Sequence, residues 1–364
     1  MNINAQSSPL PTFKLSLTSA IKLVRLFIPS LVLGLITTDP MFAAPLQAEI
    51  PFLNIAATEQ ALGTDAAAYH ALQEGRSEDA TALLHTTLAV NPSDATAHQL
   101  LCRVYYAQDD ADSAIPQCEM AVTYASSSSD LASDCQLWLG RSYGMKARHA
   151  GPIAGFTLAR KVNASFERAV ERNPSNVAAL NDLGEYYVAA PFFIGGGSDK
   201  AHALAARMMP RFPAAAHRLL ARIADSGNDL KTAEFEFKQA VAAEHTTEAW
   251  IDLAQFYQDH ARPDEALSAV KAAVAADRNR GPALVDAASI LTAAQRAPDL
   301  AERCLRDYLG SHAKSDAAPA FKVHLQLSRL LAARGDTPDA NREVAAAAAL
   351  SPAFTRNARI AQGL

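Results

Sequence analysis

Between residues 248 and 276 the apolar positions fall in two blocks separated by a short polar stretch. Within each block they recur every three or four residues, the spacing that places side chains on one face of a helix. They are Trp250, Leu253, Ala254 and Tyr257 in the first block and Ala266, Val270 and Ala273 in the second. The pattern predicts two antiparallel helices joined by a turn.

The same two-block pattern recurs along most of the chain. The first block returns in the segments LLCRVYY, LWLGRSY and LGEYY, and more weakly in LLARIAD. In the second block a small residue recurs, at intervals of 32 to 39 residues between neighbouring units. These residues are Ala80, Ala114, Ala201, Ala233, Ala266, Ala301 and Ala340, and helix-ending prolines follow at Pro92, Pro174, Pro213 and Pro352. About eight consecutive units are therefore expected between residues 61 and 352.

The repeated unit resembles the tetratricopeptide repeat, in which Trp, Leu, Gly and Tyr of a first helix are followed by Ala and Pro of a second. The resemblance covers nearly all of the chain after residue 48. It implies an all-α fold, a right-handed α-solenoid of about eight TPR-like helix pairs at residues 49–352, with a C-terminal tail or short capping helix at 353–364. A small residue lets the two helices cross closely, and stacking of the units supplies the core.

Two neighbouring units are longer than the repeat requires. The surplus lies at residues 144–161 in one unit and at 190–200 in the next, in each case between the first and the second helix. Because both insertions stand at the same point of the repeat, we expect them to lie close together along one edge of the solenoid.

The second insertion contains the glycine run Gly195, Gly196 and Gly197. A phosphate-binding loop requires the spacing Gly-x4-Gly-Lys-Ser/Thr after a strand, and neither condition is met here. We therefore expect a turn, in which Pro191 ends one helix and Ser198 caps the next.

Three apolar residues of this insertion, Phe192, Phe193 and Ile194, are expected to tuck under the turn. The alternative is that the turn contacts a partner. The residues of such a contact are Phe192, Phe193, Gly195, Gly196, Gly197 and Lys200.

The first 48 residues differ from the rest of the chain. Lys14, Lys22 and Arg25 precede an uncharged run at 26–38, and small residues follow. A basic segment, a short apolar core and a small-residue exit are typical of a secretory signal peptide. We predict a signal peptide at 1–48 and a periplasmic or secreted protein. The alternative is an uncleaved N-terminal anchor in the inner membrane, the one case in which a membrane contact is expected.

The four cysteines are Cys102, Cys118, Cys135 and Cys304. Export would permit disulfides, and the first three cysteines would lie on successive helices, so one bridge among them is one interpretation. The other is that all four are small buried apolar residues. Their spacing does not match a zinc site.

No catalytic or cofactor motif is found. His98, His217 and His324 occupy the position that Trp250 holds in the clearest repeat, which predicts helix packing and not metal binding. Neither Gly-x-Ser-x-Gly nor His-Glu-x-x-His occurs. The net charge of −5 lacks the basic excess that nucleic-acid binding requires. The chain is predicted not to be an enzyme and to need no cofactor.

The remaining candidate site is the concave face, which first helices line. Its inward-pointing residues are predicted to be Arg103, Tyr106, Arg141, Asn181, Glu185, Arg218 and Arg222. In the tetratricopeptide family such grooves often hold a peptide, so the resemblance implies an acidic or C-terminal peptide that guanidinium groups grip. The alternative is that the arginines are solvated or paired with neighbouring acids. The family's Lys and Asn clamp is not reproduced as a set, and Glu185 lies among the arginines.

The sequence thus predicts a non-catalytic protein–protein interaction scaffold of the bacterial cell envelope that binds a protein or peptide on its concave face. One alternative is a membrane-tethered assembly factor with an uncleaved N-terminal helix. The other is an enzyme or ligand-binding protein that uses the insertions at 144–161 and 190–200.

Overall fold

The computed structural model describes residues 65–125 and 129–361, so the predicted signal peptide at 1–48 lies outside the described residues. Their secondary structure is entirely helical. The first helices of eight pairs are α3 (Ala66–Gln73), α5 (Ala95–Ala107), α7 (Ser129–Ala147), α9 (Val177–Ala189), α11 (Pro213–Ser226), α13 (Thr247–Asp259), α15 (Ala283–Ala293) and α17 (Ala320–Ala333).

The second helices are α4 (Ser77–Val90), α6 (Ala111–Tyr124), α8 (Pro152–Arg172), α10 (Ser198–Met208), α12 (Leu230–Glu244), α14 (Pro263–Ala276), α16 (Pro298–Leu309) and α18 (Thr337–Leu350). A 3-10 turn, η2 (Phe192–Ile194), separates α9 from α10, and α19 (Pro352–Ala361) follows the last pair. The predicted α-solenoid of eight helix pairs and the short C-terminal helix are confirmed.

Each of the seven predicted alanines is the fourth residue of its second helix and is at most 4% exposed. The exception is α8, where Val162 takes this place and is 2% exposed. Val162 is the eleventh residue of α8, so this helix begins seven residues early. The first insertion therefore lengthens α8 by two turns, about 10 Å at 1.5 Å per residue.

Polar bonds repeat with the units. Within a unit, a histidine on the first helix contacts Gln or Glu on the second. The pairs, measured from Nδ1 of the ring, are His98 with Gln117 at 2.8 Å, His217 with Glu236 at 2.7 Å and His324 with Glu343 at 2.6 Å. The prediction that these histidines serve helix packing is confirmed.

Between units, the tyrosine of a first helix donates to a glutamate on the preceding second helix. The pairs are Tyr143 with Glu119 at 2.6 Å, Tyr187 with Glu167 at 3.0 Å and Tyr257 with Glu234 at 3.0 Å. Such bonds contribute about 1 kcal/mol each and fix how one unit stacks on the next.

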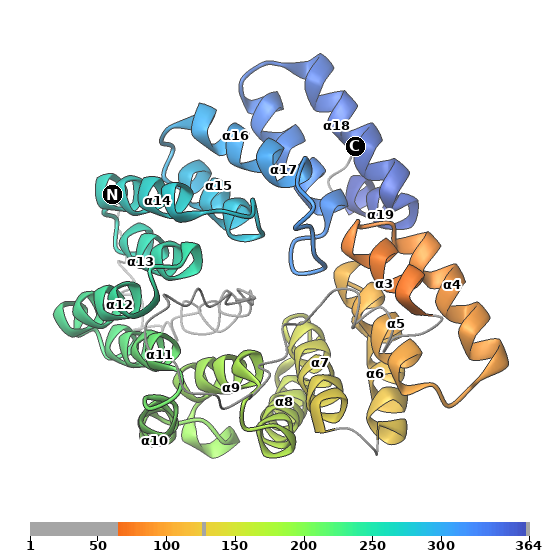
Figure 1. Ribbon diagram of the computed structural model, residues 1–364, viewed down its shortest axis with the longest axis horizontal. Helices are drawn as coiled ribbons and strands as arrows, with labels where there is room; N and C mark the ends of the chain where they lie inside the picture. Colours follow the sequence, from red (N-terminus) through yellow and green to blue (C-terminus); the bar gives the residue numbers. More distant parts are fainter. Residues whose placement is uncertain (1–64, 126–128, 362–364) are drawn as a thin grey trace, which may run out of the picture.

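The two ends of the solenoid meet, so the helices form a ring. Figure 1 shows the orange helices α3–α5 beside the blue helices α17–α19. We call this junction the seam. At its centre the guanidinium of Arg103 donates twice to the carboxylate of Asp316, at 2.7 and 2.9 Å. The Asp316 side chain is 4% exposed. Removing one partner of such a buried pair costs about 3–5 kcal/mol.

Other contacts extend the seam. Lys322 lies 2.7 Å from Asp109, and Lys314 lies 3.1 Å from Glu74. Ala107 packs into a small apolar cluster around Phe321. Helices across the seam touch over shorter stretches than helices that follow each other in the chain. The ring is therefore closed by charged pairs together with a small apolar cluster.

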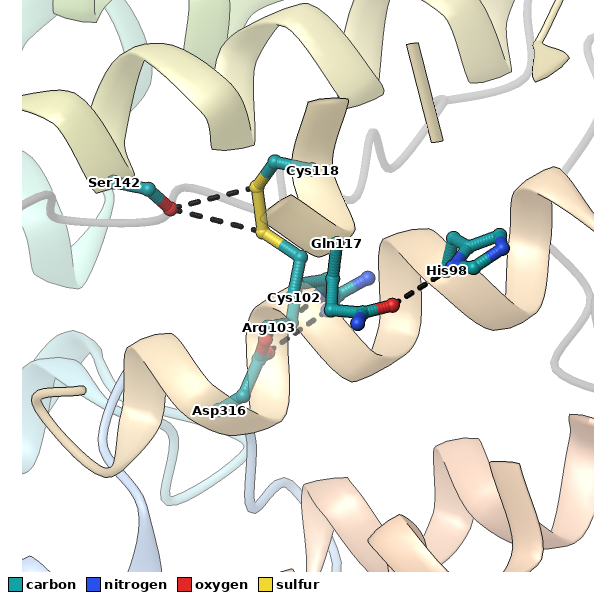
Figure 2. The surroundings of a disulfide bond; sticks show 7 residues. All are labelled: His98, Cys102, Arg103, Gln117, Cys118, Ser142 and Asp316. Carbon is teal, nitrogen blue, oxygen red and sulfur yellow. Dashed lines mark hydrogen bonds and ion pairs between the residues drawn. A yellow bond between two sulfur atoms is a disulfide. The ribbon is translucent and has the colours of Figure 1, made fainter. Parts of the chain in front are cut away.

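A disulfide joins Cys102 on α5 to Cys118 on α6. Figure 2 shows the Ser142 hydroxyl facing both sulfur atoms, at 3.7 Å from Cys102 and 3.4 Å from Cys118. Cys135 and Cys304 are buried free thiols. Burial raises the pKa of Cys135 to about 12, with a further rise from Asp134, and burial raises the pKa of Cys304 to about 11. The first of the two interpretations, one bridge among three cysteines, is confirmed.

In the described part of the chain, no helix combines the length and the apolar character needed to cross a bilayer.

We predict that the protein, unfolded without reductant, presents two reactive thiols, and four after reduction, in a thiol titration. Reduction should also lower the free energy of unfolding by about 3 kcal/mol, since the bridge closes a loop of about 16 residues. Four thiols in the unreduced, unfolded protein would contradict the disulfide.

Candidate functional site

The seven residues predicted for the concave face lie on four consecutive first helices, α5, α7, α9 and α11. Figure 1 shows first helices such as α9, α13, α15 and α17 on the inner side of the ring, with α10, α14, α16 and α18 outside them. The predicted surface is therefore the inner face of a closed ring.

Each predicted arginine is already paired with an acid. Besides Arg103 and Asp316, the pairs are Arg141 with Asp182 at 2.6 Å, Arg218 with Asp252 at 2.8 Å and with Glu185 at 3.1 Å, and Arg222 with Glu185 at 3.2 Å. In every case the partner acid lies on another helix pair. We call these residues of α7, α9, α11 and α13 the arginine ladder, because they link neighbouring units along the inner face.

Glu185 is the central acid of this ladder. Burial alone would raise the pKa of its carboxyl group, but the guanidinium groups of Arg222 and Arg218 outweigh burial and lower it below the ordinary value. The carboxylate is thus charged and held between two cations. Its position among the arginines is explained by pairing.

Sequence reasoning missed the acids that complete the ladder. Asp182 and Asp252 stand two residues before Gly184 and Ala254, the small residues at the helix crossings. This common position relative to the small residues was the sequence signal that could have identified the two acids. Asp316 lies between α16 and α17, outside the repeat pattern, and no such signal existed for it.

Two arginines retain donors without an acceptor. Nη1 of Arg141 is buried and makes no hydrogen bond. Within the described residues, Arg222 bonds only through Nε, to the two carboxylate oxygens of Glu185. The Arg141 side chain is 3% exposed, so its free nitrogen is out of reach of a ligand. The Arg222 side chain is 20% exposed, so an oxygen supplied by a ligand would form charge-assisted bonds with its terminal nitrogens.

An aromatic group lies beside one of these arginines. The guanidinium groups of Arg103 and Arg141 stack on the Trp138 ring, at 5.0 and 4.7 Å from its centre. Tyr106 packs edge-on against the same ring at 5.3 Å. Trp138 thus holds both arginines in place. The remaining predicted residue, Asn181, is half-buried, and its side chain has no partner among the described residues.

Farther along the inner face, Asp286 has no cationic partner among the described residues. Asp286 of α15 stands in the same register as Asp252 and has no ion pair in the described part of the chain. Burial raises its pKa to about 7, helped by the negative charges of Asp252 and Glu248. The inner face therefore passes from a neutralised stretch at α7–α11 to an acidic one at α13–α15.

The glycine run forms the predicted turn. Gly195 has φ +101°, and a Cβ at Gly196 would lie 1.9 Å from the carbonyl oxygen of Ala190, so neither position tolerates a larger residue. Lys200 donates to the carbonyl of Gly195 at 2.9 Å and is 3.7 Å from Glu167. The lysine therefore closes the turn.

Two details of this turn were predicted wrongly. Phe192 and Phe193 do not tuck under it but are 82% and 62% exposed. Only Ile194 packs on the core, because the single turn of η2 presents one side to α8. Ser198 is the first residue of α10, and the cap position is taken by Gly197, which offers no side-chain bond.

The described residues contain no group of three or more His, Cys, Asp or Glu side chains arranged to hold a metal ion.

Comparison with known proteins agrees with the helix-pair architecture. Residues 71–132, which span α4, α5 and α6, match the family model described as tetratricopeptide repeat. The match covers a short part of the chain, and the remaining units show the same helix pairs and register. The described residues therefore have the fold of a TPR-like α-solenoid.

Several solved structures are similar to this chain in fold. Yeast Tom70 is 15% identical with a TM-score of 0.47, over 94% of this chain and 69% of Tom70. A thermophilic TPR protein of Thermus thermophilus is 22% identical with a TM-score of 0.38, over 59% and 99%. One from Parabacteroides merdae is 11% identical with a TM-score of 0.42, over 71% and 93%. A search of curated proteins found no match.

We predict that Asp286→Asn stabilises the protein at pH 8 but not at pH 4. The raised pKa means that the folded state keeps a proton which the unfolded state releases above about pH 4. Stability therefore falls as pH rises from about 4 to 7, and the substitution removes this loss. Melting curves should show a gain of a few degrees at pH 8. An equal effect at both pH values would contradict this assignment.

Proposed function

We propose that this protein is an exported, non-catalytic scaffold that binds an acidic or C-terminal segment of a partner protein on the inner face of its ring. A tetratricopeptide-type fold suggests a protein–protein interaction scaffold. The observation that carries the finer proposal is that the partly exposed Arg222 has unused donors, its two terminal nitrogens.

The acids already present leave room for only a small number of ligand contacts. Arg103 and Arg218 each use two nitrogens on protein carboxylates. Nη1 of Arg141 is buried, whereas the Arg222 side chain is 20% exposed. A partner carboxylate would therefore bind the free nitrogens of Arg222 without displacing the ladder. Charge-assisted bonds of this kind are about twice as strong as neutral ones.

Export is supported by two features. The segment 1–48 has the basic, apolar and small-residue succession of a signal peptide. The Cys102–Cys118 disulfide suits an oxidising compartment such as the periplasm. Mass spectrometry of the mature N-terminus tests this part of the proposal, and recovery of residues 1–25 from the mature protein would favour the membrane-tethered alternative.

The enzyme alternative required converging polar groups at the two insertions. Lys200 instead bonds the turn itself, and the aromatic side chains of Phe192 and Phe193 face solvent. This arrangement supports a binding protein.

The binding site can be tested with a displayed library of peptides that carry free C-termini. Wild-type protein should enrich peptides rich in Asp and Glu or recognised by their C-terminal carboxylate. Arg222→Gln should weaken binding of the enriched peptides about 10-fold, because it removes a charged hydrogen bond worth about 1.5–3 kcal/mol.

The matched control is Arg262→Gln. Arg262 also pairs with acids, Glu234 and Glu265, but stands at the turn before α14. Circular dichroism confirms that both variants are folded. Enrichment without acidic or C-terminal preference, or equal affinities of wild type and Arg222→Gln, would show that the arginine ladder is not the binding site.

A further inference from the structure

The lengthened start of α8 and the turn η2 together form an exposed apolar surface. The described residues expose nine large apolar side chains, and four of them belong to these two insertions. They are Ile153 at 88%, Phe156 at 44%, Phe192 at 82% and Phe193 at 62%. We call these four residues the edge patch.

The two halves of the edge patch are fixed to each other. The hydroxyl of Tyr186 lies 2.9 Å from the carbonyl oxygen of Ala159 on α8 and 2.7 Å from that of Ile194 in η2. The backbone of Gly195 lies against the Asn163 side chain, where a Cβ would approach within 2.8 Å. Phe156 precedes Ala159 by less than one helical turn. The prediction that the two insertions adjoin is confirmed.

The patch projects from the ring. Val162 takes the position that the fourth residue holds in the other second helices. Helix α8 therefore begins seven residues before the usual start. Of the residues from Pro152 to Phe156, all but Gly155 are exposed.

Cations without acidic partners lie beside the patch. Between Asp134 and Glu167 the chain has no acidic residue, although it has 38 in its 364 residues. Of the five cations in this stretch, Arg141 and Lys146 pair with Asp182 and Asp112, and the others are Arg148, Arg160 and Lys161. Arg160 follows Phe156 by one helical turn and has no ion pair among the described residues, and the exposed Lys161 stacks on Tyr143 at 4.8 Å. From Tyr186 to Ser198 the chain has no charge at all.

Projecting aromatic and aliphatic side chains flanked by Arg and Lys are the chemistry that binds an anionic membrane surface. The apolar groups enter the boundary between headgroups and acyl chains, and the cations bind the lipid phosphates. We propose that the edge patch docks this protein on anionic lipid bilayers. The patch is separate from the arginine ladder, so this inference does not depend on the proposed peptide binding.

The test is flotation of the chain from residue 49 onward, which contains every described helix but not the predicted signal peptide or anchor, with vesicles of phosphatidylcholine alone or mixed with an equal part of phosphatidylglycerol. Wild type should float with the anionic vesicles and not with the neutral ones. Ile153→Ser with Phe156→Ser, and separately Phe192→Ser with Phe193→Ser, should each reduce binding at least 10-fold. Arg160→Glu with Lys161→Glu should abolish it. All variants share the same N-terminal residues, so a difference reports on the edge patch.

The matched control is Val90→Ser with Phe235→Ser, which removes two exposed apolar side chains of α4 and α12. This variant should float like wild type. As a direct readout of insertion, Phe192→Trp should show a blue shift of tryptophan emission with anionic vesicles, relative to the emission of Trp138 and Trp250 in wild type.

Three results would overturn the proposal. They are binding that does not depend on phosphatidylglycerol, Ser variants of the edge patch that float like wild type, and an unshifted emission of Phe192→Trp. If wild type does not bind vesicles and the Ser variants lose a protein partner that wild type binds, the patch is a protein contact instead.

Discussion

The buried pair of Arg103 and Asp316 joins parts of the chain that are 213 residues apart, and the arrangement of the whole ring depends on it. A solenoid exposes an unpaired apolar face at each end, which most repeat proteins cover with polar capping units. Here the two ends cover each other, with Ala107 against the Phe321 cluster and Glu74 beside Lys314. Among the charged pairs of the seam, Arg103 and Asp316 are the buried pair, so leaving one of these two unpaired is costly.

A second set of ion pairs determines what the inner face can do. Acids on the neighbouring units neutralise the arginines of α7 and α11, and these pairs join units that follow each other in the chain. Asp182 and Asp252 link unit to unit in the same way that Tyr187 and Tyr257 do on the other side of the helices. Most of the inner face is therefore structural, and the capacity to bind a ligand is concentrated in donors that this pairing leaves unused.

The fold was predictable because its rules are local. The spacing of Ala80, Ala114 and their counterparts predicts where the two helices of a unit cross. This crossing depends only on residues within the same unit. The turn at Gly195 was predictable for the same reason. Closure was not, because it follows from small rotations summed over eight units, and Asp316 lies outside the repeat. The acids of the ladder were present in register at Asp182 and Asp252 but were overlooked. The exposure of Phe192 was missed because sequence does not reveal on which side of a single turn the core lies.

The closed ring is tested most directly by a zero-length carbodiimide cross-link between carboxylates and lysines, with peptides of the monomer identified by mass spectrometry. The seam places Lys322 at 2.7 Å from Asp109 and Lys314 at 3.1 Å from Glu74. Lys146 and Asp112, 2.7 Å apart on successive helices, supply the internal control. We expect both seam cross-links in the monomer at yields comparable to the control. Recovery of the control cross-link with neither seam cross-link would show that the ends of the solenoid do not meet.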